Sequence, residues 1–224
     1  MKRHILISAL LLISFAVQAN NQLHTTYKRG TFTTVKTASV DADFSTCSKA
    51  IDDFIYEFQT DPELLFSWAL KNTGQTHNGD GSDDVILVMN RVTYDPEAMK
   101  STINADFIMP NGFSIGNKDL MSYVHDNRAD NTREITVDFY YSGSLLKKGK
   151  GVFLLTKIDD SHTDIKLTID IKFGWFFNIF ITKKRYKDVM EWRIGQFIDN
   201  IKEESQWRFE GDPRQHVRKV KSER

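Results

Sequence analysis

The stretch DIKLTIDIKF (residues 164–173) alternates between polar and apolar side chains at every step. Because successive side chains of a strand point to opposite faces, a period of two predicts a strand with one face in water and the other on a core. Half-buried strands of this kind are typical of antiparallel sheets. The face that we expect to be buried carries Ile165, Leu167, Ile169, Ile171 and Phe173.

The apolar period then changes to that of a helix, between residues 182 and 207. A helix of about 25 residues is about 37 Å long, which is enough to cross a small sheet. Its charged residues fall largely away from the apolar stripe, so the helix has one apolar face. We expect this face to pack on the apolar face of the sheet, and it is formed by Tyr186, Val189, Met190, Ile194, Phe197, Ile198 and Ile201.

The same two periods predict the elements upstream. A strand over residues 31–35 precedes an amphipathic helix from Cys47 to Phe58, for which Asp43 or Ser45 could be the N-cap. Asp61 followed by Pro62 predicts the start of a second short helix, because these residue types favour the cap and the first turn. After a loop over residues 72–84, strands are predicted over residues 85–94, 99–109, 119–126, 135–141 and 152–158.

The chain thus contains one strand, two short helices, six further antiparallel strands and one long terminal helix, which is an α+β arrangement. This order resembles the helix-grip fold of the START-like superfamily, which includes the birch-pollen allergen family and the polyketide cyclases. The resemblance covers about residues 28–206 and rests on the order and length of the elements. It implies a curved seven-stranded antiparallel sheet that wraps around the C-terminal helix, with a cavity between them.

The N-terminal segment has the features of a secretory signal peptide. Lys2 and Arg3 precede an apolar stretch over residues 5–17, and small residues follow for cleavage near Ala19. The apolar stretch is shorter than the ~20 residues of a membrane-spanning helix. We predict an exported protein, periplasmic or extracellular, without a stable membrane span in the mature chain, and with a signal peptide over residues 1–19, a single START-like domain over 20–207 and a charged tail over 208–224.

Composition and motifs exclude several classes of protein. The 30 basic and 30 acidic residues of the 224-residue chain balance, so no net charge attracts it to nucleic acid. The single cysteine, Cys47, excludes a disulfide framework and a Cys-rich zinc site, and its place on an apolar helix face predicts a buried, inert thiol. No histidine pair has the spacing of a helical metal site, and no Gly-x-Ser-x-Gly sequence occurs. We expect no metal and no cofactor.

A curved sheet that meets its helix at the ends leaves its middle open, and inward side chains would line that space. Flexible methionines would suit ligands of variable shape. A glycine in the middle of the terminal helix costs ~1 kcal/mol relative to alanine, which a close approach of backbone or ligand would explain. The residues predicted to line the cavity are Met89, Phe107, Met121, Tyr123, His125, Phe139, Trp175, Met190, Ile194 and Gly195.

Two other features have a structural and a functional interpretation. The aromatic run over residues 173–180 would either plug one end of the core or form a hydrophobic lip at the cavity mouth. The basic residues that open the terminal helix are either solvated or bind an anionic head group beside the cavity, and they are Lys183, Lys184 and Arg185.

Three functions are consistent with this sequence. The first is an exported, non-catalytic binding protein for an apolar or amphipathic, lipid-like small molecule. The second is a structural or protein-interaction module, which a solidly packed interior would favour. The third is an enzyme similar to cyclases or hydrolases of the superfamily, in which Tyr123 and His125 would act as acid and base inside the cavity. A single hydrogen-bonding histidine in such a place is more often structural than catalytic.

Overall fold

Eight antiparallel strands form one open sheet in the part of the chain that the computed structural model describes, which is residues 23–69, 71, 86–108, 112–140, 146–174 and 181–210. Neighbouring strands pair in the order β1-β2-β8-β7-β6-β5-β4-β3, so β1 and β3 form the two edges. The strands are β1 (Leu23–Lys28), β2 (Thr31–Val40), β3 (Ile86–Asp95), β4 (Lys100–Ile108), β5 (Ser114–Ala129), β6 (Thr132–Tyr140), β7 (Leu146–Lys157) and β8 (Thr163–Phe173).

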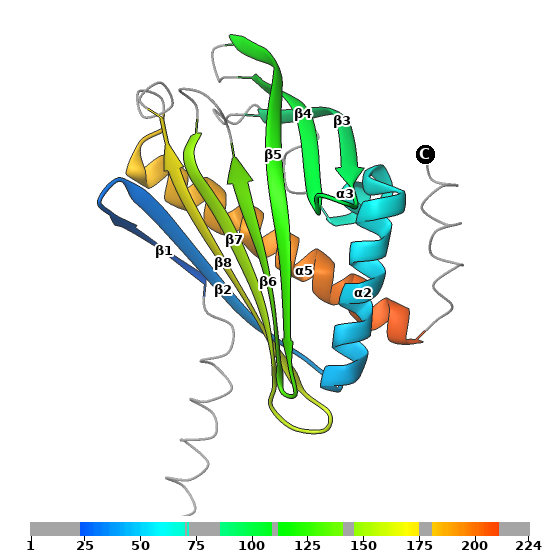
Figure 1. Ribbon diagram of the computed structural model, residues 1–224. Coiled ribbons are helices and arrows are strands. Elements are labelled where there is room, and N and C mark those ends of the chain that lie inside the picture. Colours follow the sequence, from blue (N-terminus) through cyan, green and yellow to red (C-terminus); the bar gives the residue numbers. More distant parts are fainter. Residues whose placement is uncertain are drawn as a thin grey trace, which may run out of the picture.

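Helices cover one face of this sheet. Between β2 and β3 lie α2 (Phe44–Thr60) and α3 (Pro62–Ala69), and α5 (Lys183–Glu210) follows β8. Figure 1 shows α5 crossing the sheet from the side of β1 and β2 toward α2, and α5 contacts all three of these elements. This arrangement of a curved antiparallel sheet around a long C-terminal helix confirms the predicted α+β, helix-grip fold.

The sheet has eight strands where the sequence predicted seven, because β1 was missed. This edge strand has no fully buried side chain, so it lacks the apolar alternation that marks a strand facing a core. It joins β2 through Arg29 and Gly30, whose φ angles are 52° and 82°. Positive φ at both positions is the geometry that two-residue hairpin turns favour.

Four predicted segments lie wholly or partly outside the described residues. They are the signal peptide over residues 1–19, the loop over 72–84, the aromatic run beyond residue 174 and the tail from residue 211. The predicted tail began at residue 208, but α5 continues through Glu210. Within the described chain, no helix is long and apolar enough to cross a membrane.

Aspartates start the two short helices. The Asp43 carboxylate accepts a hydrogen bond from the Thr46 backbone N–H at 2.9 Å, which makes Asp43 rather than Ser45 the N-cap of α2. Asp61 ends α2 and accepts from the Leu64 N–H at 3.1 Å, so it begins α3 as predicted. Because one residue separates the two helices, α3 turns away directly after α2 and both lie against the same core.

The core forms where the apolar face of β8 meets the helices. Ile165 and Leu167 are buried in one cluster with Ile194 and Ile198 of α5, which confirms that the two apolar faces meet. Cys47 of α2 belongs to the same cluster, and burial raises the pKa of its thiol. The prediction of a buried cysteine is therefore confirmed, and the protonated thiol is a poor nucleophile.

The two ends of α5 are anchored differently. Near its start, the Tyr186 ring stacks on Phe32 of β2 with ring centres 3.9 Å apart, and burial raises the pKa of Tyr186 to about 12. Nearer its end, the Asn200 amide donates to the backbone carbonyls of Ala69 at 3.0 Å and Lys71 at 2.8 Å. The Asn200 amide thus satisfies the Ala69 carbonyl, which the end of α3 leaves without a helical partner, and it fixes α3 to α5.

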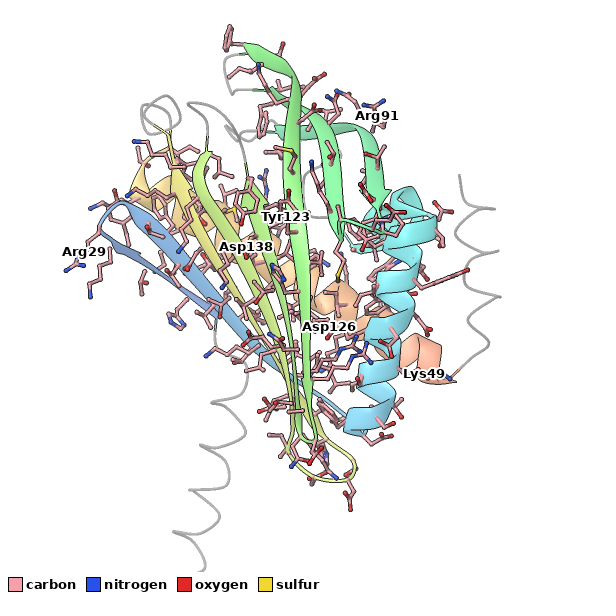
Figure 2. All side chains as sticks on the ribbon, in the orientation of Figure 1. Arg29, Lys49, Arg91, Tyr123, Asp126 and Asp138 are labelled. Carbon is pink, nitrogen blue, oxygen red and sulfur yellow. The ribbon has the colours of Figure 1, made fainter. Side chains whose placement is uncertain are left out.

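The buried guanidinium group of Arg133 connects α2 to the sheet. Arg133 of β6 is 1% exposed, and its Nη2 lies 2.7 Å from Asp126 Oδ2 and 2.8 Å from Asp52 Oδ1. Its Nη1 donates to the backbone carbonyl of Ser48. Arg128, which is 56% exposed, pairs with the same two carboxylates from the solvent side. The four side chains join α2, β5 and β6, and Figure 2 shows Asp126 on β5 near α2.

The two arginines hold Asp126 ionised. Burial alone would raise the pKa of Asp126, but hydrogen bonds from Arg133 and then Arg128, together with their positive charges, hold the pKa below its ordinary value of 3.8. A carboxyl group whose folded-state pKa is depressed stabilises the fold above its unfolded-state pKa. That contribution is lost as the pH falls below about 4.

We expect Arg133→Met to lower the free energy of unfolding by about 3–5 kcal/mol at pH 7, because it leaves two carboxylates without their buried partner. Arg128→Met removes an exposed partner of the same carboxylates and should cost only about 0–1 kcal/mol. Urea unfolding of both variants measures the difference, which should narrow as the pH falls below about 4. Equal losses for the two variants would contradict this ranking.

Candidate functional site

A cavity of about 420 Å³ lies between the sheet and the three helices. The helices contribute Ile51, Asp52, Phe54, Ile55, Phe58, Leu65, Trp68, Ala69, Phe197 and Ile201. The strands and the β3–β4 turn contribute Tyr94, Met99, Ser101, Ile103, Ser122, Val124, Asp126, Arg128, Ile135, Val137, Phe139, Gly151, Phe153, Leu167 and Ile169. Apolar side chains make up most of both sets, so the cavity has a hydrophobic lining with a few polar side chains.

Aromatic rings form the helical wall of the cavity. The rings of Phe54 and Trp68 lie 4.9 Å apart, which joins α2 to α3 at this wall. Phe58, one helical turn further along α2, lies edge-on to Tyr94 of β3 at 5.4 Å. The indole N–H of Trp68 donates to Glu57 at 3.1 Å, so the polar atom of this ring is satisfied and its apolar surface serves the cavity.

Apart from Tyr94, the polar side chains that line the cavity beside the sheet lie in two places. Ser101 of β4 and Ser122 of β5 are directly opposite each other in the sheet, and their hydroxyl groups are hydrogen-bonded. Farther along β5, Asp126 and Arg128 belong to the ion-pair network that includes Asp52. The charged groups of the lining are therefore paired with one another, whereas the serine pair is uncharged.

Three predicted cavity residues lie on the wrong face of β5. Ser122, Val124 and Asp126 line the cavity, and strand alternation places Met121, Tyr123 and His125 on the opposite face. Tyr123 instead packs edge-on against Tyr140 at 5.3 Å, and Tyr140 is half exposed. Figure 2 shows Tyr123 and Asp126 on the long strand β5. The cavity acid–base pair of the enzyme hypothesis is therefore contradicted.

The α5 residues that line the cavity lie further along the helix than the predicted ones. Ile194 is buried in the core and Met190 packs against that core, but neither lines the cavity, whereas Phe197 and Ile201 do. Gly195 does not face the cavity either, because a Cβ atom at this position would meet Leu23 of β1 at an ordinary 3.5 Å. The glycine is thus not required by a close approach, contrary to the prediction.

The other predicted lining residues have mixed outcomes. Phe139 of β6 lines the cavity. Phe107 is half-buried near the end of β4, past a register shift between Ala105 and Phe107, and does not line it. Met89 lies in β3, but its side chain is outside the described set, as is all of Trp175.

The predicted anion-binding residues lie at the start of α5, away from the cavity lining. The Lys183 ammonium lies 4.4 Å from the centre of the Tyr27 ring, a cation–π contact with β1. Lys184 is exposed, and the side chain of Arg185 is outside the described set. The two described lysines therefore do not provide a cation to a ligand in the cavity.

Sequence reasoning missed Ser101, Ser122 and Gly151. Nothing in the sequence distinguishes two serines in half-polar strands from solvent-facing residues, because their pairing depends on the register of β4 and β5. The apolar face of α2 was recognised, but its role in lining a cavity was not. Gly151 offered a signal, since a glycine inside a strand pattern marks a position where space or close approach matters.

Two glycines of β7 differ in the space around them. A Cβ atom on Gly149 would lie 3.0 Å from Phe139 Cβ and 3.2 Å from Leu146 Cδ2, so both neighbours would have to move by a few tenths of an ångström to accept a side chain. A Cβ atom on Gly151 would meet only the Val137 carbonyl oxygen, at 4.0 Å. Gly149 is thus favoured by packing, whereas Gly151 contributes open volume to the cavity.

We expect Gly149→Val to destabilise the fold by about 1–3 kcal/mol through overpacking. Gly151→Val should be neutral or stabilise it by up to about 1 kcal/mol, because a β-branched residue suits a strand and the cavity accepts its methyl groups. Thermal and urea unfolding of the two variants measure the contrast. A loss of stability in Gly151→Val as large as that in Gly149→Val would show that the space is not available.

Comparisons with known proteins return structural similarity without sequence similarity. The sequence matches no protein-family model and no curated protein. A START superfamily protein from Mycobacterium smegmatis shares 10% identity over 78% of this chain and 97% of its own, with a TM-score of 0.45. An aromatase/cyclase from a Streptomyces species shares 10% identity over 79% and 94%, with a TM-score of 0.47. Norcoclaurine synthase from Thalictrum flavum shares 12% identity over 81% and 95%, with a TM-score of 0.42.

The strand order and the helix placement define the class of this protein: a helix-grip protein with an apolar cavity between its sheet and its helices. Within the described residues, no group of three or more His, Cys, Asp or Glu side chains is placed to hold a metal ion.

Proposed function

We propose that this protein is an exported, non-catalytic binding protein for an apolar or amphipathic small molecule held in the cavity. The observation that carries the proposal is the cavity itself, whose volume of about 420 Å³ is within the range of roughly 300–1,000 Å³ typical of ligand pockets. Its lining has the usual composition of such sites, namely apolar and aromatic side chains with a small number of polar groups.

The energetics of the fold favour an occupant. Side chains around an empty cavity lack dispersion contacts on one side. A bound apolar ligand would supply these contacts. A ligand that removes apolar surface from water gains roughly 25 cal/mol for each Å² buried. The open space beside Gly151 is consistent with a cavity that the sequence keeps available, since a larger residue would fit there.

The charged groups at the described cavity wall are all committed to ion pairs, which supports a binding role over a catalytic one. Asp52, Asp126 and Arg128 line the cavity but pair with one another and with Arg133. A general acid or base needs a proton-transfer site that faces the substrate, and Tyr123 and His125 lie on the other face of the sheet. A purely structural module would favour a filled interior, so we rank it second.

The proposal is tested with an uncharged fluorescent probe, N-phenyl-1-naphthylamine, whose emission rises in apolar sites. We expect the purified protein to bind it, and Gly151→Leu to weaken binding about tenfold, equivalent to ~1.4 kcal/mol of lost contact. Val152→Leu adds bulk at the adjacent position on the other face of β7 and serves as the matched control. Native extraction followed by mass spectrometry should recover an apolar compound.

A protein that neither binds the probe nor yields an extractable compound would overturn the proposed function. Equal weakening by Gly151→Leu and Val152→Leu would place the probe outside the cavity. Circular dichroism and the unfolding midpoint of both variants show whether the fold is retained.

Export rests on the N-terminal segment. Two basic residues, an apolar stretch over residues 5–17 and small residues before Asn20 have the order of a cleavable signal. We expect the full chain, produced in a bacterial host with an intact secretion system, to be recovered from the periplasm with Asn20 at its N-terminus. N-terminal sequencing and cell fractionation measure this, and an uncleaved cytoplasmic product would contradict it. Ala19→Leu should block cleavage because the cleavage position requires a small side chain.

A further inference from the structure

The serine pair is an uncharged, buried polar spot in the largely apolar wall of the cavity. Ser101 is 0% exposed and Ser122 is 3% exposed, and both line the cavity. Ile103 and Val124, the next cavity-facing residues on the same two strands, are apolar. The hydroxyl groups are thus held in a surrounding where a missing hydrogen bond is costly.

The serine pair has one more donor hydrogen than the hydrogen bond between its two hydroxyl groups uses. Two hydroxyl groups carry two donor hydrogens, and only one of them is used in the bond between Ser101 and Ser122. Within the part of the chain that the structure describes, neither hydroxyl group has another hydrogen-bond partner. When Ser101 donates to Ser122, the hydrogen of Ser122, the member of the pair that keeps some exposed surface, is available to an acceptor in the cavity.

The charges of the cavity favour an uncharged ligand. Arg128 is the one cation among the described lining residues, and it already pairs with Asp52 and Asp126. Arg133, buried behind the lining, is committed to the same two carboxylates. A carboxylate or phosphate group in the cavity would lose its hydration without gaining a free cation, which is unfavourable.

The serine pair and the ion-pair network also lie at a distance from each other. Ser122 and Asp126 are four residues apart on β5, which corresponds to about 14 Å along a strand. Val124 lies between them on the cavity face. A ligand whose polar atom is at the serine pair can therefore place an apolar body along the wall without meeting the charged end.

We propose that the ligand is an uncharged amphipathic molecule, such as a long-chain alcohol, whose single oxygen accepts a hydrogen bond from the Ser101–Ser122 pair. This inference rests on the proposed function, since it names the class of ligand for the same cavity. The apolar body supplies most of the affinity, and the serine pair binds the neutral oxygen. The lack of a free cation among the described lining residues disfavours a charged head group.

The test compares 1-dodecanol with dodecanoate, which have the same chain length and differ at the polar end. Displacement of N-phenyl-1-naphthylamine from the protein at pH 8 gives both affinities. We expect dodecanol to bind at least about tenfold more tightly, because the ionised acid must be desolvated. Lowering the pH so that the acid becomes neutral should narrow this difference.

The matched variants separate the hydrogen bond from the fold. Replacing both partners of a buried hydrogen bond by apolar groups of similar shape is nearly neutral for stability, so Ser101→Ala/Ser122→Ala should fold. It should weaken dodecanol binding about two- to tenfold, the equivalent of one hydrogen bond, and leave dodecanoate unchanged. Thr102→Val removes a hydroxyl group on the opposite face of β4 and should change neither affinity.

The outcomes distinguish this inference from the proposed function. Tighter binding of dodecanoate than of dodecanol, or dodecanol binding that the double alanine variant does not change, would overturn the inference while the cavity still binds the probe. Failure of both compounds to displace a bound probe would overturn it as well. If the probe itself does not bind, the result contradicts the proposed function, and the inference about the ligand class is then overturned as well.

Discussion

The structure depends on a mismatch between the length of the strands and the width of the helix that crosses them. The 16 residues of β5 extend over about 54 Å, whereas a helix with its side chains is about 10–12 Å across. α5 alone therefore cannot cover the apolar face. It packs on β1 and β2 at one side, and α2 and α3 cover the rest. The cavity lies where these helices and the curved sheet fail to meet completely.

Buried polar contacts hold the helices in place around the cavity and stabilise the fold. The buried Arg133 and its two carboxylates hold α2 against β5 and β6, and the Asn200 amide holds α3 against α5. Both contacts use charged or amide groups with fixed directions, so they set the positions of α2 and α3 without requiring that apolar side chains fill the space between. The aromatic stack of Tyr186 on Phe32 fixes the start of α5 in the same way.

Among the described residues, the lining combines a large apolar surface with a neutral hydrogen-bonding pair of serines. The two kinds of polar group therefore have different roles: the ionised groups are saturated by each other and stabilise the fold, whereas the serine hydroxyl groups retain one donor hydrogen. A cavity of this kind derives affinity from apolar burial and selectivity from the penalty on an unpaired polar group. The geometry of the sheet, rather than any sequence motif, creates this combination.

The sequence by itself determined the periodic features. Alternation in residues 164–173 predicted the buried face of β8, the helical stripe from Tyr186 to Ile201 predicted the face of α5, and Asp61 predicted the start of α3. These follow from short-range geometry, because a repeat of 2 or 3.6 residues fixes which side chains share a face. Such repeats were enough for the fold class and for the order of the described elements other than β1, which has no buried apolar face.

Only the tertiary structure decided which face of β5 is inside. Alternation divides this strand into one set with Met121, Tyr123 and His125 and another with Ser122, Val124 and Asp126, and both sets mix polar with apolar residues. The second set faces inward because Ser122 pairs with Ser101 across the sheet and Asp126 meets the buried Arg133. A buried polar group requires a partner, and that partner comes from another strand, so the register of β4, β5 and β6 placed the site.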